Sequence, residues 1–308
     1  MNKDVKILLR KVGIFVLPVF AWICIVLIVD PFNYFSVSNL ISIKAKGKSA
    51  QQLNSLLYNA VNFKNNPTNS IIIGDSRIRK LPNERIKEIT GDTYYTMYSN
   101  AAKLNEIIDL FWFSTEHSKL KNVLIGINFN LYNEYAYANR VADVKEMIDN
   151  PFIYIFNNNT AETIYLTLKN ELLGISGKGG RNKEEFWNYN IQTIAKNHYS
   201  KYKYPEKILE RLQEMSAYCK TNGIKLTVLI VPIHLDFHNR LMDYNLSEQE
   251  QRFKNEIKGI GNVIDFGYAN IITNNKACFG DPLHTTDSIG KIMVDEIFLD
   301  SLVIGREL

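Results

Sequence analysis

The chain has 308 residues, of which 46% are hydrophobic and 22% are charged, and these proportions are typical of a globular protein rather than a disordered or fibrous one. Its 36 basic and 32 acidic side chains give a formal charge of +4. Residues 1–11 hold four basic side chains and one acidic, so the remainder is close to neutral. A near-neutral remainder argues against a nucleic-acid-binding protein, and the lack of a fixed-period repeat argues against a solenoid or propeller.

An uncharged apolar segment covers residues 12–29, with the sequence VGIFVLPVFAWICIVLIV. As a helix it reaches about 27 Å, close to the hydrocarbon thickness of a bilayer. The basic residues precede it, which predicts a cytoplasmic N-terminus and an extracytoplasmic location for everything after Asp30. A cleaved signal peptide is the alternative, but no small-residue cleavage site follows Val29. We therefore expect a single-pass protein of the inner or plasma membrane, with a periplasmic or extracellular domain.

Apolar segments and amphipathic segments alternate along the rest of the chain. The alternation predicts a parallel sheet covered by helices on both faces, a three-layer α/β domain over residues 70–308 that follows a lead-in at 30–69. Ligands of such sheets bind at the carboxyl ends of the strands. The expected strands are 70–73, 93–98, 122–128, 226–233 and 262–266, and the expected helices are 49–63, 103–119, 205–221, 247–258 and 286–303.

Residues 134–203 interrupt this alternation and are rich in Asn and Tyr. Their length exceeds an ordinary crossover, so we expect an insertion beside the strand ends, either shaping a substrate groove or serving as a helical decoration. The glycine-rich stretch at 174–180 neither follows a strand nor ends in Gly-Lys-Ser/Thr, so it predicts a loop rather than a phosphate site.

Two short motifs lie at the same predicted edge of the sheet. Gly74-Asp75-Ser76 follows the first strand, and Asp281-Pro282-Leu283-His284 follows the fifth. A serine nucleophile needs a base to take its proton and an acid to orient that base. Asp281 can hold one ring nitrogen of His284 while the other faces Ser76, with the glycine allowing a sharp turn. Ser76, His284 and Asp281 are therefore the candidate nucleophile, base and orienting carboxylate.

In these motifs the sequence resembles the SGNH/GDSL hydrolase superfamily, with Ser76 matching its first block and Asp281 with His284 matching its last. The resemblance covers most of residues 70–303. It implies a flavodoxin-like sheet and ester hydrolysis or acyl transfer through an acyl-serine.

The middle blocks of the superfamily match less well. Gly126-Ile127-Asn128 echoes the third block, which implies that Asn128 is an oxyanion donor beside the backbone N–H of Ser76. The glycine of the second block has no counterpart. Asn100 and Ala101 stand at its place, where the amide of the first or the backbone N–H of the second can substitute.

A closer likeness is to membrane-anchored SGNH-like proteins of cell-envelope polymer modification, which include the alginate O-acetylation proteins and the protein that acts in D-alanylation of teichoic acids. The shared features are the anchor, the Asp30-Pro31 segment, the serine block and the late Asp-x-x-His. This likeness implies acyl transfer or removal on an exported, acylated polysaccharide, with a multispanning membrane acyltransferase as partner and membrane lipid around the anchor.

Other polar residues near the strand ends are weaker candidates. Arg77 could contact an anionic substrate or simply be solvated, and His234, one residue past the fourth strand, is a candidate groove residue. His234 and His238, with Asp236 nearby, are two possible metal ligands without a third. We therefore expect no metal and no cofactor.

The remaining histidines and cysteines carry less information. His117 and His198 are expected at the surface. Cys219 and Cys278 are either one disulfide or two unpaired core residues.

Two classes of function fit the sequence. The first is an exported serine esterase or O-acyltransferase. The second is a catalytically inactive envelope protein of the same fold that binds glycan or a membrane partner. The complete set of triad residue types favours the first, and the imperfect middle blocks favour the second.

Overall fold

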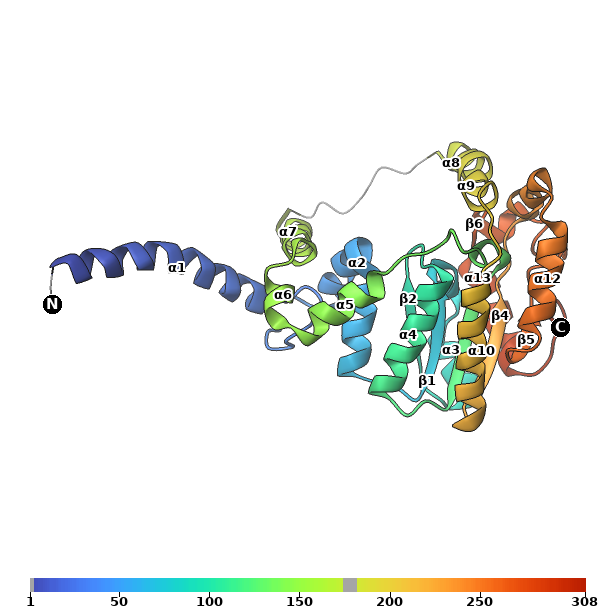
Figure 1. The fold of residues 1–308 in the computed structure, drawn as a ribbon, viewed down its shortest axis with the longest axis horizontal. Helices are drawn as coiled ribbons and strands as arrows, with labels where there is room; N and C mark the ends of the chain where they lie inside the picture. The colour runs from blue at the N-terminus through green and yellow to red at the C-terminus, as the bar shows by residue number, and fades with distance from the viewer. Residues whose placement is uncertain (1–2, 174–181) are drawn as a thin grey trace. The chain divides into compact units, whose positions relative to one another are not determined.

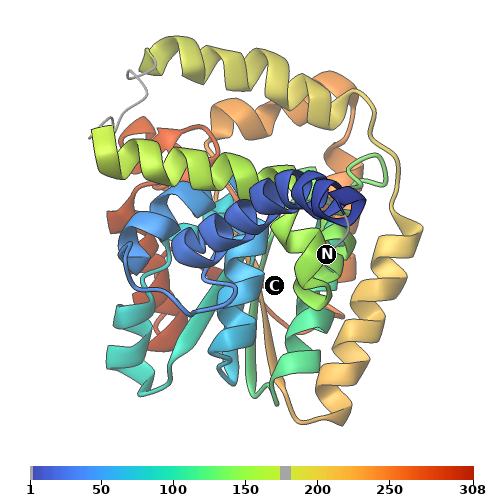
Figure 2. The same ribbon diagram turned by 90° about the vertical axis from the view of Figure 1, so that its left-hand side faces the viewer.

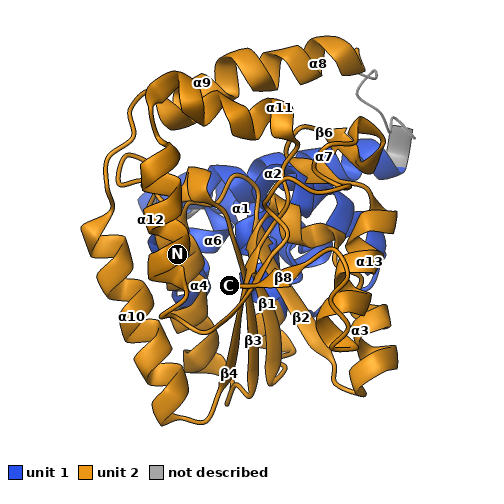
Figure 3. Cartoon of the chain, turned by 90° about the vertical axis from the view of Figure 1, so that its right-hand side faces the viewer, with its two compact units in different colours: residues 1–62, 142–178 blue, residues 63–141, 179–308 orange. Residues whose placement is uncertain are grey.

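The computed structural model describes residues 3–173 and 182–308 as an α/β protein with a mostly parallel central sheet and an apolar N-terminal helix (Figure 1). The glycine-rich stretch at 174–180 lies outside the described residues. The chain divides into two compact units: unit 1 consists of residues 1–62 and 142–178, and unit 2 of residues 63–141 and 179–308 (Figure 3).

The sheet of unit 2 has the strand order β2-β1-β3-β4-β5-β8. Strands β1 to β5 are parallel, and the short β8 pairs antiparallel with β5. All five strands expected from the sequence are present, because each is an apolar run between turn-forming residues. The bounds are β1 Ser70–Asp75, β2 Tyr94–Ser99, β3 Asn122–Ile127, β4 Lys225–Ile230, β5 Asn262–Asp265 and β8 Arg306–Glu307.

Helices of unit 2 cover both faces of the sheet (Figures 2 and 3). On one face, Ile72, Leu124 and Leu229 of the strands pack with Ile86 of α3 and Met293 of α13 in one buried cluster. The other face carries α4, α10 and α12 (Figure 3). The bounds are α3 Asn83–Thr90, α4 Leu104–His117, α10 Glu206–Thr221, α12 Ser247–Ile257 and α13 Asp287–Phe298.

The last predicted helix is shorter than expected, ending at Phe298 rather than near 303. Asp300 then adopts a φ of 54°, in the left-handed region, which turns the chain away from the helix. The buried Glu296 carboxylate accepts hydrogen bonds from the backbone N–H groups of Val303, Ile304 and Gly305. These bonds hold the terminal segment where β8 can pair with β5.

The interrupted region contains helices that the sequence did not resolve individually. They are α5 Arg140–Asp149, α6 Pro151–Ile155, α7 Asn158–Leu173, α8 Lys183–Tyr189, a π-helical turn at Asn190–Ile194, and α9 Ala195–Tyr199. Residues 142–178 belong to unit 1, whereas α8 and α9 belong to unit 2.

Unit 1 also contains α1 (Lys3–Val29) and most of α2 (Ile43–Asn65), which is broken at Asn54 by non-helical backbone angles. Within the described residues, α1 alone is long and apolar enough to cross a membrane, with a mean hydropathy of 3.0 over its best window.

Short elements connect the larger ones in unit 2. They are the 3₁₀ turns Ser76–Lys80, Phe129–Leu131, Asn239–Tyr244 and Lys276–Cys278, the helix α11 (Leu235–His238), and a hairpin of β6 (Phe279–Asp281) and β7 (His284–Thr285).

Candidate active site

Ser76 is the first residue of the 3₁₀ turn that leaves β1 at the carboxyl edge of the sheet. The turn folds back over the strand ends, with Ile78 buried against them. A Cβ atom at Gly74 would lie 2.9 Å from the Ile78 side chain, and one at Gly126 would lie 2.1 Å from it. Gly74 is therefore needed for this close approach rather than for the sharp turn that we expected from the sequence.

Asp281 and His284 face each other across the β6–β7 hairpin. Nδ1 of His284 lies 2.9 Å from both carboxylate oxygens of Asp281, and Nε2 lies 2.7 Å from Oγ of Ser76. The segment that follows β4 holds the hairpin in place, because the backbone N–H of His234 donates to the carbonyl of Pro282 at 2.8 Å. The structure thus brings together three side chains that the sequence separates by as many as 208 positions.

The hydrogen bonds assign the protons in this chain of groups. Asp281 accepts the Nδ1 proton of His284, which leaves Nε2 to accept the hydroxyl proton of Ser76. Burial raises the pKa of Asp281, but hydrogen bonds and the charge interaction with His284 outweigh burial and hold the pKa below its usual value. Asp281 is therefore an anion at neutral pH, positioned to stabilise a protonated imidazole.

Ser76 and His284 open onto a cavity of about 140 Å³. The cavity is small beside the several hundred Å³ of an ordinary ligand pocket, and it suits a short acyl group. Its other lining residues come from the ends of β1, β2 and β3, from the helix α9 and from the hairpin: Asp75, Arg77, Ala101, Ala102, Lys103, Asn130, Leu131, Ile194, His198 and Leu283.

Arg77 is buried, with 6% of its surface exposed, and it is not the solvated side chain that was one reading of the sequence. Its Nε lies 2.9 and 3.0 Å from the Asp75 carboxylate oxygens, and Nη1 donates to Oδ1 of Asn130 at 3.0 Å. The carboxylate compensates the buried guanidinium, as a buried charge requires. Arg77 therefore acts within the fold by fixing the orientation of the Asn130 amide.

Asn130, rather than the expected Asn128, is the asparagine that lines the cavity. The Asn128 amide donates to the backbone carbonyl of Val231 at 2.8 Å and so ties β3 to β4, and Asn128 does not line the cavity. Asn130, two residues further on, lines it. Because Arg77 occupies Oδ1 of Asn130, the NH₂ group is the part left to face a ligand. The repeated Asn in Gly-Ile-Asn-Phe-Asn was the signal for this residue.

Asn100 and Ala101 follow β2. Ala101 lines the cavity and has a φ of 54°, a conformation that favours glycine. Asn100 is exposed, and its backbone carbonyl accepts from Nη1 of Arg140 at 3.2 Å. Of this pair, Ala101 is the one that the structure places at the cavity.

His198, expected at the surface, lines the cavity instead. It is carried there by α9, which follows directly on the π-helical turn that ends in another lining residue, Ile194. Burial, with the positive charges of Lys103 and Arg77 nearby, lowers the pKa of His198 to about 4. The imidazole is therefore neutral at physiological pH. Sequence reasoning missed it because no periodic pattern relates residues 183–199 to the strand ends.

The lowered pKa of His198 predicts an acid-sensitive fold. The unfolded chain binds this proton at about pH 6.5 but the folded chain only at about pH 4, so the free energy of unfolding falls as pH drops between these values, by up to about 3 kcal/mol. His198→Gln should lose this contribution. Urea unfolding of both proteins in detergent from pH 7.5 to 4 should give curves that are parallel above pH 7 and diverge below it; curves parallel throughout contradict the prediction.

His234 and His238 do not form a metal site with Asp236. Nδ1 of His234 accepts from the backbone N–H of Asp236, whereas Nε2 of His238 lies 3.4 Å from Glu250. Burial lowers the pKa of His234, whose ring packs between Trp187 and Phe279. His234 is therefore a buried helix-capping residue that does not line the cavity.

No metal-ligand cluster of three or more His, Cys, Asp or Glu side chains occurs in the described residues. Cys219 and Cys278 are both free thiols, so the disulfide alternative does not hold. His117, expected at the surface, is half-buried, and its ring lies 2.8 Å from the Phe113 carbonyl.

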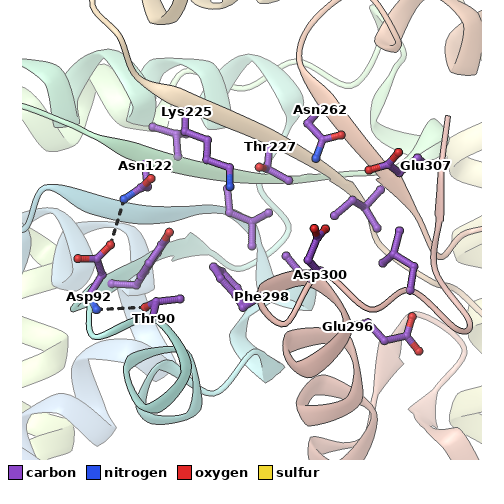
Figure 4. Close-up of a pocket in the computed structure, with 16 residues that line it drawn as sticks. Thr90, Asp92, Asn122, Lys225, Thr227, Asn262, Glu296, Phe298, Asp300 and Glu307 are labelled. Carbon is purple, nitrogen blue, oxygen red and sulfur yellow. Dashed lines mark hydrogen bonds between the residues drawn. The ribbon is translucent and has the colours of Figure 1, made fainter.

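A second cavity of about 320 Å³ lies at the opposite edge of the sheet, around the first residues of β2 to β5 (Figure 4). Polar groups such as Asp92, Asn122 and Lys225 line it, and the Asn122 amide donates to Asp92 at 3.3 Å. It contains none of the three side chains of the hydrogen-bonded chain. The smaller cavity, which holds a nucleophile beside a base, is the candidate active site.

Comparison with known proteins does not assign this chain to a family. No family model and no curated protein matches the chain. Among solved structures, a protein described as "a putative platelet activating factor from Streptococcus pneumonia" aligns over 83% of this chain and 94% of its own, with 11% identity and a TM-score of 0.39. So low a TM-score and identity assign neither a family nor an activity.

Proposed function

We propose that this protein is a membrane-anchored serine esterase or O-acyltransferase with a flavodoxin-like SGNH fold, acting on short acyl esters of an extracytoplasmic polysaccharide. The observation that carries the proposal is the continuous chain from Ser76 Oγ through His284 to the Asp281 carboxylate. The strand order 2-1-3-4-5 supports the fold, since it is the order of flavodoxin-like sheets, whose ligands bind at the edge where Ser76 lies.

The chemistry follows from the proton assignment. Ser76 Oγ attacks the ester carbonyl carbon while Nε2 of His284 takes the hydroxyl proton, and Asp281 stabilises the imidazolium that forms. The bond to the leaving alcohol then breaks as His284 returns the proton to the alcohol oxygen. The acyl-serine is resolved by water in a hydrolase or by a sugar hydroxyl in a transferase, with His284 again taking the proton.

The negative charge of the tetrahedral intermediate needs hydrogen-bond donors at the cavity. Three groups are candidates: the backbone N–H of Ser76, the backbone N–H of Ala101 and the NH₂ of Asn130. Asn130 takes the part that the sequence suggested for Asn128. The buried Asp75–Arg77 pair holds its amide in one orientation, so this donor is positioned before substrate binds.

Asn130→Ala should lower kcat by about 10²-fold or more, as loss of one oxyanion donor does elsewhere, with a smaller change in KM. Asn128→Ala is the matched control, because its amide bonds to Val231 rather than facing the cavity, so it should affect stability more than kcat. Steady-state hydrolysis of an aryl acetate by both variants makes the comparison. A larger loss of kcat in Asn128→Ala would return the role to Asn128.

The substrate class rests on the size of the cavity and on the anchor. About 140 Å³ is enough for an acetyl group. The apolar α1 preceded by basic residues favours an extracytoplasmic domain held at the membrane, within reach of envelope glycans and of a multispanning acyl donor protein.

Mass spectrometry of the full chain after reaction with a fluorophosphonate tests the proposal. An adduct on Ser76 is expected, because only an activated serine reacts rapidly. The matched control is Ser288, an exposed serine that hydrogen-bonds to Thr286 and should stay unmodified. Absence of an adduct on Ser76 would favour the other class, an inactive envelope protein that binds glycan or a membrane partner.

A further inference from the structure

The short helix α6 of unit 1 has one buried face and one exposed aromatic face. Tyr154 and Ile155 are buried, whereas Phe152 in the first turn and Phe156, the residue that caps the C-terminal end of the helix, are 70% and 54% exposed. No charged side chain occurs from residue 150 to 161; the nearest are Asp149 and Glu162. An exposed aromatic pair within an uncharged segment indicates a surface that contacts something apolar.

A polar turn fixes α6 to the end of α1. The buried Asp30 carboxylate accepts hydrogen bonds from the backbone N–H groups of Tyr34, Phe35 and Ser36 at 2.7–3.1 Å. The ring of Tyr34 stacks on that of Tyr154 with centroids 4.2 Å apart. The Tyr34 hydroxyl also donates to the Ile148 carbonyl, just before α6. The position of α6 along α1 is therefore defined within this unit.

α6 also contacts α1 well before its C-terminal end. The indole N–H of Trp22 donates to the backbone carbonyl of Ile155 at 2.9 Å. Trp22 precedes Asp30 by eight residues, which is about 12 Å along a helix. From residue 22 onward α1 is partly covered, with Val26 and Val29 buried, whereas its apolar residues between 12 and 20 are largely exposed.

The uncovered apolar part of α1 is too short to span a bilayer. Between Lys11 and Trp22 lie residues 12–21, which reach about 15 Å, half of the roughly 30 Å hydrocarbon core. The rest of the span must come from residues 22–29, the part against which α6 packs. If α1 crosses the membrane, α6 lies at the depth of the outer lipid leaflet.

We propose that α6 is a second membrane contact, with Phe152 and Phe156 inserted at the headgroup–acyl boundary of the outer leaflet beside α1. This inference rests on the anchor in the proposed function, not on the catalytic chemistry. The partner is lipid, because the depth set by the Trp22 hydrogen bond places α6 within the outer leaflet. Aromatic side chains of interfacial helices are enriched at that level, about 5–10 Å into the boundary.

Fluorescence quenching in pure lipid vesicles tests the inference. Single cysteines carry an environment-sensitive dye in the full chain, in a background with Cys24→Ala, Cys219→Ala and Cys278→Ser whose fold is verified by circular dichroism. The quenchers are two phosphatidylcholines, one with a nitroxide near the headgroup end of its acyl chain, for positions 152 and 156, and one with a nitroxide near the methyl end, for position 19, which lies near the bilayer centre. The labelled variants are Phe152→Cys and Phe156→Cys, with Val19→Cys on the uncovered part of α1 and Asp143→Cys on an exposed face of α5 as references.

Positions 152 and 156 should be quenched about twofold or more relative to position 143, since interfacial insertion brings them to the depth of the nitroxide. If position 19 is quenched but positions 152 and 156 are quenched no more than position 143, the inference is overturned while the anchor stays intact. No quenching at 19 would remove the anchor and the inference together. Because the vesicles contain no other protein, lack of quenching at 152 and 156 would point instead to a protein partner for this face.

Discussion

Replacing Ser76 by alanine should abolish ester hydrolysis and leave the fold intact. Among the described residues that line the cavity, Ser76 is the one whose hydroxyl is hydrogen-bonded to Nε2 of His284 and so positioned to attack a carbonyl carbon. We therefore expect the rate of aryl acetate hydrolysis to fall by about 10³-fold or more. The loss of one partly exposed hydrogen bond should change the free energy of unfolding by about 1 kcal/mol or less. Steady-state kinetics and thermal unfolding of the full chain measure both effects.

The matched control is Ser288→Ala on the exposed first turn of α13, which removes a hydroxyl that lies outside the cavity. It should keep the wild-type rate. Equal rates for wild type and Ser76→Ala would mean that the hydrolysis does not pass through this serine, and the geometry would then describe an inactive relative of a serine enzyme.

The sheet was predictable from the sequence because each of its main strands has a recognisable local sequence pattern. β1, β3 and β4 are runs of Ile, Val and Leu that end at the expected residues within a few positions. The alternation of these strands with amphipathic helices is sufficient to indicate parallel strands joined by helical crossovers. The helices between 140 and 199 were not individually predictable, since their apolar residues serve several surfaces and their order does not follow the strand–helix alternation.

The site was predictable to the extent that function depends on residues just after strands. Ser76 directly follows β1, and Asp281 and His284 lie on the hairpin between β5 and α13, so the carboxyl-edge rule brings them together. Asn130 was missed because a 3₁₀ turn after β3 moves the cavity-facing position three residues beyond the strand end. His198 was missed for a different reason: it belongs to a helix whose docking depends on long-range packing, such as the ring contact with Phe237.

The environment of Arg77, next to the nucleophile, was not predictable from the sequence. The sequence left open whether Arg77 is solvated or contacts a ligand; it is buried and paired with Asp75, and it lines the cavity. Asp75 and Arg77 are two residues apart, a spacing that places both side chains on one face of an extended chain, but the sequence alone did not show that this face is buried. Asp75 ends β1 and caps the turn that begins at Ser76: its carboxylate accepts from the backbone N–H of Arg77 and pairs with the Arg77 guanidinium.

Asp281→Asn should lower kcat by about 10³-fold, with little change in KM. The carboxylate accepts the Nδ1 proton of His284, and an asparagine amide can instead donate to Nδ1, which places the ring proton on Nε2 facing Ser76. The imidazole then cannot take the serine proton. Asp281→Glu keeps a carboxylate and should retain more activity than Asp281→Asn. The control is Asp287→Asn, which loses only an exposed ion pair with Lys80 and should match wild type.

The same substitution has a second readout in acid stability. The pKa of Asp281 in the folded chain is below its usual value of about 3.9, so its ionised form contributes stability above that pH, and the contribution is lost as pH falls through the lower, folded-state value. The free energy of unfolding of Asp281→Asn should therefore depend less on pH below about 4 than that of wild type. A variant with unchanged kcat and an altered acid dependence would make Asp281 a residue of the fold alone, with the imidazole oriented by another group.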